Sequence, residues 1–309
     1  GSQMTKIRST DSSNIDDRRG RGGGSSGGSG GLPFQIPGMG GSGGGLPGGL
    51  KAGGGLLGII VLLAAMFLPK LLNAGGTSQA ASLPAQSTGS STSGCVTELE
   101  QIVCGVTNDV QDYWTRELPT AFNTQYEMTK TVWFTGGVST GCGQASSETG
   151  PFYCPADHLV YIDLEFMQQL ENMLIGSTSD LAEQYILAHE YGHHVQNLLG
   201  IDGQVQQAAQ SDPGDANKYS VALELQADCF AGAWVGDANA RGLLDNAQEI
   251  QEAIKAAEGV GDDRIQARSG GRIDPESWTH GSAEQRKSWF MTGFNSQDPT
   301  TCTSVEQVL

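Results

Sequence analysis

The sequence predicts an α+β domain with a small sheet, preceded by one membrane-spanning helix. Three observations lead to this fold class: an uncharged apolar run at residues 52–68, two strand-like stretches, and several helical stretches after Gly176. The chain has 309 residues, but its uneven composition reduces it to one folded domain, with no visible internal repeat. We expect this domain at residues 95–309.

The N-terminal arm, residues 1–51, is predicted to be disordered. Residues 1–3 precede Met4 and are interpreted as a cloning remnant. From Arg18 to Gly55 the chain is dominated by Gly, Ser and Pro, which cannot bury enough apolar surface to offset the entropy of ordering. A similar Ser/Gly/Ala-rich composition predicts a flexible linker at residues 71–94.

Residues 52–70 are predicted to form a single transmembrane helix. The run AGGGLLGIIVLLAAMFL carries no charge and is bounded by Lys51 and Lys70. As a helix it would rise roughly 26 Å, at the short end of what a bilayer core requires. A buried core helix is the alternative, but Gly/Ser-rich sequence on both sides offers no core. A cleaved signal peptide is the other alternative, and it would need an unusually long charged leader.

Charge predicts the orientation of this helix. Residues 1–51 contain six basic and three acidic side chains, whereas the whole chain has a net charge of −17. Basic arms stay on the cytoplasmic side, so we expect a cytoplasmic N-terminus and a translocated domain. The acidic balance also argues against nucleic acid as a partner, because such a surface repels phosphate backbones.

All six cysteines follow the apolar run, where an oxidising compartment would let them pair. Fifteen pairings are conceivable. We favour the two pairs that are close in sequence, which leaves the remaining two cysteines for each other. The expected disulfides are Cys95–Cys104, Cys142–Cys154 and Cys229–Cys302.

The elements of the domain follow in chain order. Residues 107–128 have helical spacing, with Pro119 breaking the run, and 130–134 and 159–164 have the composition of strands. A helix is then expected after a capping box at Asp180-x-x-Glu183, ending at Gly200. Two more helices are expected at 217–240 and 283–294, the latter opened by Ser282-x-x-Gln285.

The first of these helices contains the segment HEYGH, residues 189–193. His189 and His193 are four residues apart and therefore project from one helix face, a separation that suits two ligands of one tetrahedral zinc. Glu190 is placed to take a proton from a metal-bound water. Gly192 fits a helix whose backbone is closely approached. A chance match on a helix surface is the competing interpretation, and a third ligand would decide between the two.

The helix at 217–240 offers that ligand in LELQADCFAGAW. Glu224 and Asp228 share a face, so one can bind metal while the other accepts the N–H of a ligating histidine. A surface salt bridge is the alternative for Glu224, but its neighbours are too apolar. Cys229 is a conceivable ligand, although we favour its disulfide. His194 points away from the metal face and is interpreted as a neighbour of the site or a surface residue.

The chain resembles the gluzincin metallopeptidases in its H-E-x-x-H followed by Glu-x-x-x-Asp, and THGSAEQR is similar to the T-H-P-x-x-x-x-R of their membrane-bound branch, with Gly281 in place of proline. Over nearly its whole length it is similar to the bacterial "putative neutral zinc metallopeptidase" family. The matching segments are DDRRG, TGCG, GPFYCPAD, VYIDLEF, AHEYGHHVQNLLGI, ELQADCFAGAW, GDDRIQ, WTHGSAEQR and DPTTC.

The resemblance implies a zincin-like domain in which His189, His193 and Glu224 hold one Zn²⁺ and Glu190 is the base, leaving Asp228 as the partner of a ligating histidine. By analogy with gluzincins, His280 would stabilise the oxyanion, although a helix-start histidine bonded locally is an equal alternative.

Three further expectations concern the surroundings of the site. Arg286 would bind a carboxylate or steady Glu224. His158 is interpreted as exposed. The strand at 159–164 would by analogy be the sheet edge that receives an extended peptide.

We therefore expect an endopeptidase in the bacterial plasma membrane, acting on extracytoplasmic proteins or peptides. A catalytically silent zinc-containing scaffold is the main alternative, and a cell-wall amidase is a weaker one. The retained Glu190 favours the enzyme, because a structural zinc needs no base.

Overall fold

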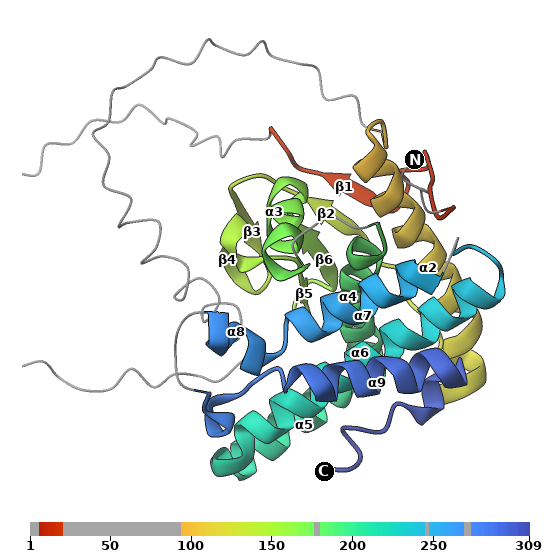
Figure 1. Ribbon diagram of the computed structural model, residues 1–309. Coiled ribbons are helices and arrows are strands. Elements are labelled where there is room, and N and C mark those ends of the chain that lie inside the picture. The colour runs from red at the N-terminus through yellow and green to blue at the C-terminus, as the bar shows by residue number, and fades with distance from the viewer. Residues whose placement is uncertain (1–5, 21–93, 176–179, 245–246, 269–272) are drawn as a thin grey trace, which may run out of the picture.

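The computed structural model describes residues 6–20, 94–175, 180–244, 247–268 and 273–309. They form a small sheet that packs against a larger group of helices (Figure 1). The strands are β1 (Ile15–Asp17), β2 (Thr131–Trp133), β3 (Gly137–Thr140), β4 (Gly143–Ser146), β5 (Phe152–Cys154) and β6 (Leu159–Ile162). The helices of three or more turns are α2 (Glu98–Phe122), α3 (Leu164–Ile175), α4 (Asp180–Leu198), α5 (Ile201–Ser211), α6 (Ala216–Ala240), α7 (Ala247–Gly259) and α9 (Ala283–Ser296), and α8 (Asp262–Arg268) is shorter.

The sheet has the strand order β1-β2-β6-β5, and β3 and β4 form a separate hairpin. β1, β2 and β6 run parallel, while β5 runs antiparallel to β6 with Phe152 opposite Tyr161. β1 and β5 are therefore the edge strands, and β6 lies inside the sheet. The prediction that 159–164 forms the receiving edge is wrong, because sequence composition does not reveal strand order.

The main hydrophobic core lies between the sheet, α2 and the helices α4, α6, α7 and α9. Its largest fully buried side chains include Trp114, Trp234, Tyr185 and Phe230. α6 and α9 cross very closely: a Cβ on Gly232 would lie 2.0 Å from the Phe290 carbonyl oxygen. Only glycine permits this approach, which fixes the depth at which α6 sits in the core.

Several predicted elements agree with the structure to within a few residues. The helices expected at 217–240 and 283–294 correspond to α6 and α9, and Ser282 and Gln285 form the expected capping box. Pro119, however, does not break its helix. It lies in the last turn of α2, where only a few residues follow and the loss of one backbone hydrogen bond is tolerated.

The N-terminal arm departs most from prediction. Residues 6–20 are not a disordered tail: they belong to the folded domain and contribute β1, paired in parallel with β2. The predicted boundaries, an arm at 1–51 and a domain starting at 95, are wrong for this segment. No helix in the described ranges is long and apolar enough to cross a membrane, and the predicted span at 52–70 lies outside those ranges.

Candidate active site

The two histidines of HEYGH lie on α4, and the acidic pair Glu224 and Asp228 lies on the facing helix α6. The two helices approach closely at Gly192, where a Cβ would lie 3.1 Å from the carbonyl oxygen of Ala227. This bears out the close approach expected at Gly192. It also brings the acidic face of α6 within reach of both imidazoles.

Three potential ligand side chains converge from these helices. His189 Nε2 lies 3.2 Å from Glu224 Oε2, His193 Nε2 lies 3.1 Å from His189 Nε2, and Glu224 Oε1 lies 3.4 Å from His193 Nε2. Ligand atoms on a tetrahedral zinc with bonds of about 2.0–2.1 Å are separated by roughly 3.3 Å. The donor set and its spacing therefore fit Zn²⁺ with one position left for a water or substrate. Among the described residues, this is the one cluster of such side chains that could hold a metal ion.

His189 is oriented by a charged network. Its Nδ1 lies 2.9 Å from Asp228 Oδ1, which also accepts a hydrogen bond from the Tyr185 hydroxyl. Arg286 holds the same carboxylate with two hydrogen bonds, Nε to Oδ2 at 2.7 Å and Nη2 to Oδ1 at 2.8 Å. Because Asp228 accepts the proton on Nδ1, the Nε2 lone pair of His189 faces Glu224. Asp228 thus takes the position expected for it, and Arg286 binds this carboxylate.

Charges in this network shift the pKa values of its members. Burial opposes ionisation of Asp228, but Arg286 and His189 outweigh it and lower the pKa of the carboxyl group. Burial likewise disfavours protonated His189, yet Asp228 and Glu224 raise its pKa to about 10 when no metal is bound. A metal ion must displace that proton, so binding is expected to release protons.

His193 is oriented by neutral groups. Its Nδ1 lies 2.8 Å from Gln196 Oε1, and the Gln196 amide nitrogen donates to the Leu223 carbonyl oxygen and to Gln226 Oε1. Since the amide nitrogen is used in these two bonds, its oxygen must accept from His193 Nδ1–H. The Nε2 lone pair of His193 is then free to face the metal position, as it is in His189.

Glu190 lies beside these ligands in a pocket of about 160 Å³. It is 8% exposed, and burial raises the pKa of its carboxyl group, while the charges of His189 and His193 and, to a smaller extent, the backbone N–H of Tyr153 oppose that shift. Tyr153 is the middle residue of the edge strand β5, so this strand lies directly beside the carboxylate. Apolar side chains, including Leu170, Ile186 and Val260, line the same pocket.

His280 also lines this pocket and is 9% exposed. Its Nδ1 lies 3.0 Å from Asp262 Oδ1, and the other oxygen of Asp262 accepts the backbone N–H groups of Thr279, His280 and Gly281. The imidazole is therefore fixed with its Nδ1 occupied, which leaves Nε2 available. The structure is compatible with both predicted roles, the local hydrogen bond and the oxyanion contact, because His280 is bonded to Asp262 and also lines the pocket.

His194 and His158 lie outside the ligand set. His194 is buried: its Nε2 donates to the Glu127 carbonyl oxygen at 2.7 Å, and its Nδ1 lies 3.0 Å from the Tyr153 hydroxyl. Burial lowers the pKa of His194 to about 4, so it is neutral at physiological pH and is no surface residue. His158 is exposed, as predicted.

All three expected disulfides, Cys95–Cys104, Cys142–Cys154 and Cys229–Cys302, are present in the structure. Cys142–Cys154 ties the β3–β4 hairpin to the end of β5. Cys229–Cys302 ties the C-terminal segment to α6, one residue from Asp228. Cys229 is therefore a disulfide cysteine and is not a metal ligand.

Three residues of the site were not predicted: Tyr185, Gln196 and Asp262. Tyr185 and Gln196 lie on α4 at helical spacing from the histidines, one turn before His189 and three residues after His193. Spacing on the helix could have identified both. Asp262 lies 18 positions before His280, and no periodic pattern connects the two.

Comparison with known sequences agrees with the site. The family model described as "Putative neutral zinc metallopeptidase" matches residues 4–305. The chain is 40% identical over 293 residues to "Uncharacterized protein YpfJ" of Escherichia coli strain K12, covering 94% of this chain and 95% of that protein. It is 49% identical over 180 residues to "Uncharacterized protein Rv2575" of Mycobacterium tuberculosis strain H37Rv, covering 55% and 59% of the two chains.

No solved structure matches the chain. The family match nevertheless extends over nearly the whole sequence and includes both the N-terminal segment and the metal cluster. The chain belongs to the family described as "Putative neutral zinc metallopeptidase".

Proposed function

We propose that this protein is a zinc-dependent endopeptidase that hydrolyses peptide bonds in proteins or peptides. The observation that supports this most strongly is the convergence of His189 Nε2, His193 Nε2 and the Glu224 carboxylate in a pocket that also contains Glu190. A purely structural zinc site is closed by a fourth protein ligand and has no use for an adjacent base.

Zinc bound to these residues would polarise the scissile carbonyl and lower the pKa of a water molecule. Glu190 would accept the proton of the attacking water and later deliver it to the leaving amine. Protonated His280, whose Nδ1–H is held by Asp262, would donate from Nε2–H to the oxyanion of the tetrahedral intermediate. Asp228 and Gln196 would keep both histidines in the tautomer that presents Nε2 to the metal.

The edge strand β5 supports a peptide as substrate. It borders the pocket, and its neighbour on one side is β6, so an extended peptide can add to the opposite side with backbone hydrogen bonds. The apolar side chains around the pocket would receive an uncharged side chain of the substrate.

The three disulfides support an extracytoplasmic location, because such bonds persist in oxidising compartments. A membrane anchor at 52–70 stays a prediction from sequence. Substrates outside the cytoplasm are therefore part of the proposal.

The test compares Glu190→Gln with His193→Ala and with Glu284→Gln, an equivalent change at an exposed position of α9. Zinc content and hydrolysis of a diverse peptide library are measured for each. Glu190→Gln should retain zinc and lose at least about a hundredfold in rate, His193→Ala should lose both, and Glu284→Gln should change neither. Zinc-loaded protein that cleaves no peptide in the library would favour the silent scaffold, and full activity of Glu190→Gln would exclude the proposed base.

A further inference from the structure

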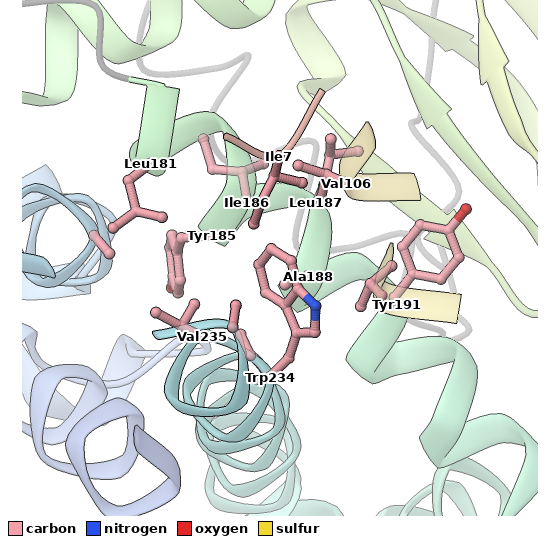
Figure 2. Packing of buried hydrophobic residues seen from close by; sticks show 14 of the residues in the cluster. Ile7, Val106, Leu181, Tyr185, Ile186, Leu187, Ala188, Tyr191, Trp234 and Val235 are labelled. Carbon is pink, nitrogen blue, oxygen red and sulfur yellow. The ribbon is translucent and has the colours of Figure 1, made fainter. Parts of the chain in front are cut away.

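The N-terminal segment, residues 6–20, fills a site between α2, β2 and the start of α4 (Figure 1). Ile7 is 4% exposed and belongs to the main hydrophobic core. Figure 2 shows it beside Val106 of α2 and beside Ile186 and Leu187 of α4, the helix that carries the HEYGH residues. Its side chain therefore occupies core space that no surface-bound tail would enter.

Backbone hydrogen bonds hold the segment along its length. Ser9 N donates to the Gln101 carbonyl oxygen at 2.9 Å, and Thr131 N donates to the Asn14 carbonyl oxygen at 2.9 Å. Further on, Arg18 N donates to the Trp133 carbonyl oxygen at 2.8 Å. The last two bonds and the β1–β2 pairing satisfy groups of β2 that would otherwise form an open sheet edge.

α2 is shaped to receive this segment. A Cβ on Gly105 would lie 2.7 Å from both the Cα and the N atom of Arg8, so any larger residue would push the two backbones apart. Close backbone approach is a specific use of glycine in a helix, where it otherwise reduces stability. The glycine at position 105 of α2 therefore permits the close backbone contact with the N-terminal segment.

Ion pairs join the same surfaces. Arg8 Nη2 lies 2.7 Å from Glu98 Oε1, and Arg19 Nη2 lies 2.7 Å from Glu100 Oε1, both on α2. The guanidinium of Arg19 also stacks 4.6 Å from the ring centre of Trp133 on β2. Arg8 and Arg19, two of the six basic residues from which the sequence analysis inferred a cytoplasmic arm, are therefore paired within the domain.

We propose that residues 6–20 are a permanent part of the metallopeptidase domain and lie on the same side of the membrane as its active site. Residues 21–93 connect this segment to the rest of the domain. One crossing of the membrane within residues 21–93, such as the single transmembrane helix predicted at 52–70, would place β1 and β2 on opposite sides, where they could not pair. The chain therefore leaves and re-enters the domain on one side, and the basic N-terminus does not define a cytoplasmic face.

Cysteine labelling of the full chain in spheroplasts tests the sidedness. Because all six native cysteines are in disulfides, single variants Thr10→Cys and Gln206→Cys each add one thiol at an exposed position, the first in the N-terminal segment and the second on α5. A membrane-impermeant maleimide should label both variants equally. A membrane-permeant maleimide measures the total amount of reactive thiol in each variant.

Labelling of one variant in intact spheroplasts and of the other only after lysis would overturn the proposal. If neither variant is labelled until the spheroplasts are lysed, both positions lie on the same side of the membrane, as proposed. That side would then be the cytoplasm, which would contradict the extracytoplasmic location proposed above. Neither result depends on peptidase activity, so the two proposals can fail separately.

Limited trypsin digestion tests the docking itself. Gly105→Ala places a methyl group against Arg8, whereas Gly203→Ala is the same change on α5 where no atom lies within 4 Å of the new Cβ. Gly105→Ala should accelerate cleavage within residues 6–20 by roughly tenfold or more, with no change for Gly203→Ala. Equal cleavage rates in the two variants and the unmodified protein would show that the segment is not held at this site.

Discussion

His189 and His193 lie four residues apart on one helix, yet the two ends of the metal site hold them by different means. At the His189 end, a buried carboxylate, Asp228, is itself held by Arg286 and Tyr185. At the His193 end, the amide oxygen of Gln196 accepts a hydrogen bond from the imidazole, and its amide nitrogen donates to Leu223 and Gln226. Both arrangements select the same tautomer, but only the first places full charges in the core.

This difference means that tautomer control and electrostatic stabilisation can be separated in one protein. A buried ion pair is costly to break, because the remaining charge is left without a partner. A buried amide is less costly to remove, because the groups left behind are neutral. Substitutions at the two ends should therefore have similar consequences for zinc and unequal consequences for folding.

The largest effect is expected for Asp228→Leu. The substitution leaves Arg286, which is 2% exposed, without its main partner, and should lower the free energy of unfolding by about 3–5 kcal/mol. Zinc affinity should fall roughly 10–100-fold because His189 loses its orienting group. Urea unfolding and zinc competition titration measure the two effects.

A double variant, Asp228→Leu with Arg286→Met, separates them. It should recover much of the unfolding free energy, because no unpaired guanidinium remains buried, but should not recover zinc affinity. Equal recovery of both would show that the carboxylate acts on the metal only through general stability.

The next effect concerns Glu183, which lies on α4 and is 3% exposed. Burial raises the pKa of its carboxyl group to about 8, with contributions from Asp180 and Glu98. A folded-state pKa above the unfolded value stabilises the protein at low pH, so this contribution is complete below about pH 4.5 and is lost as pH rises through about 8.

Glu183→Gln should remove this dependence, and above pH 8 the variant should be more stable than the unmodified protein by on the order of 3 kcal/mol. Unfolding of both metal-free proteins from pH 5 to 9 provides the measurement. Parallel stability curves for the two proteins would show that Glu183 does not titrate in this range.

A smaller effect is expected for Gln196→Met at the neutral end of the site. It should weaken zinc binding by roughly tenfold but lower the free energy of unfolding by only about 1–2 kcal/mol, since it leaves no buried charge. The same two titrations apply. A loss of stability as large as that of Asp228→Leu would contradict the distinction between the two ends.

The smallest effect is expected for Gly192→Ala, between the two ends. Its new Cβ would lie 3.1 Å from the Ala227 carbonyl oxygen, a tight contact that a slight separation of α4 and α6 relieves. The cost should be about 1 kcal/mol, with a modest decrease in zinc affinity. Gly203→Ala on α5, where the new Cβ meets no atom, is the control and should not lower either quantity.

The candidate residues of the metal cluster could be identified from sequence because they depend on local periodicity, whereas the choice of Glu224 over Asp228 as the ligand came from the family resemblance. His189, His193 and Glu190 have a fixed arrangement on any α-helix, and so do Glu224 and Asp228. The disulfides followed from two short spacings and elimination, and they are present as expected. For the helix pairs and the two close cysteine pairs, the short separation along the chain constrains how the side chains can meet. For the last disulfide, only two cysteines remain to pair.

What only the tertiary structure decided lies in contacts between segments far apart in the sequence. Nothing in the composition of 159–164 shows that β5, rather than β6, is the edge beside Glu190. Asp262 reaches His280 from the start of α8, and Arg286 reaches Asp228 because α9 packs against α6. Composition predicted disorder for residues 6–20 because it measures how much apolar surface a segment could bury alone, whereas Ile7 and β1 are stabilised by a surface that the rest of the chain provides.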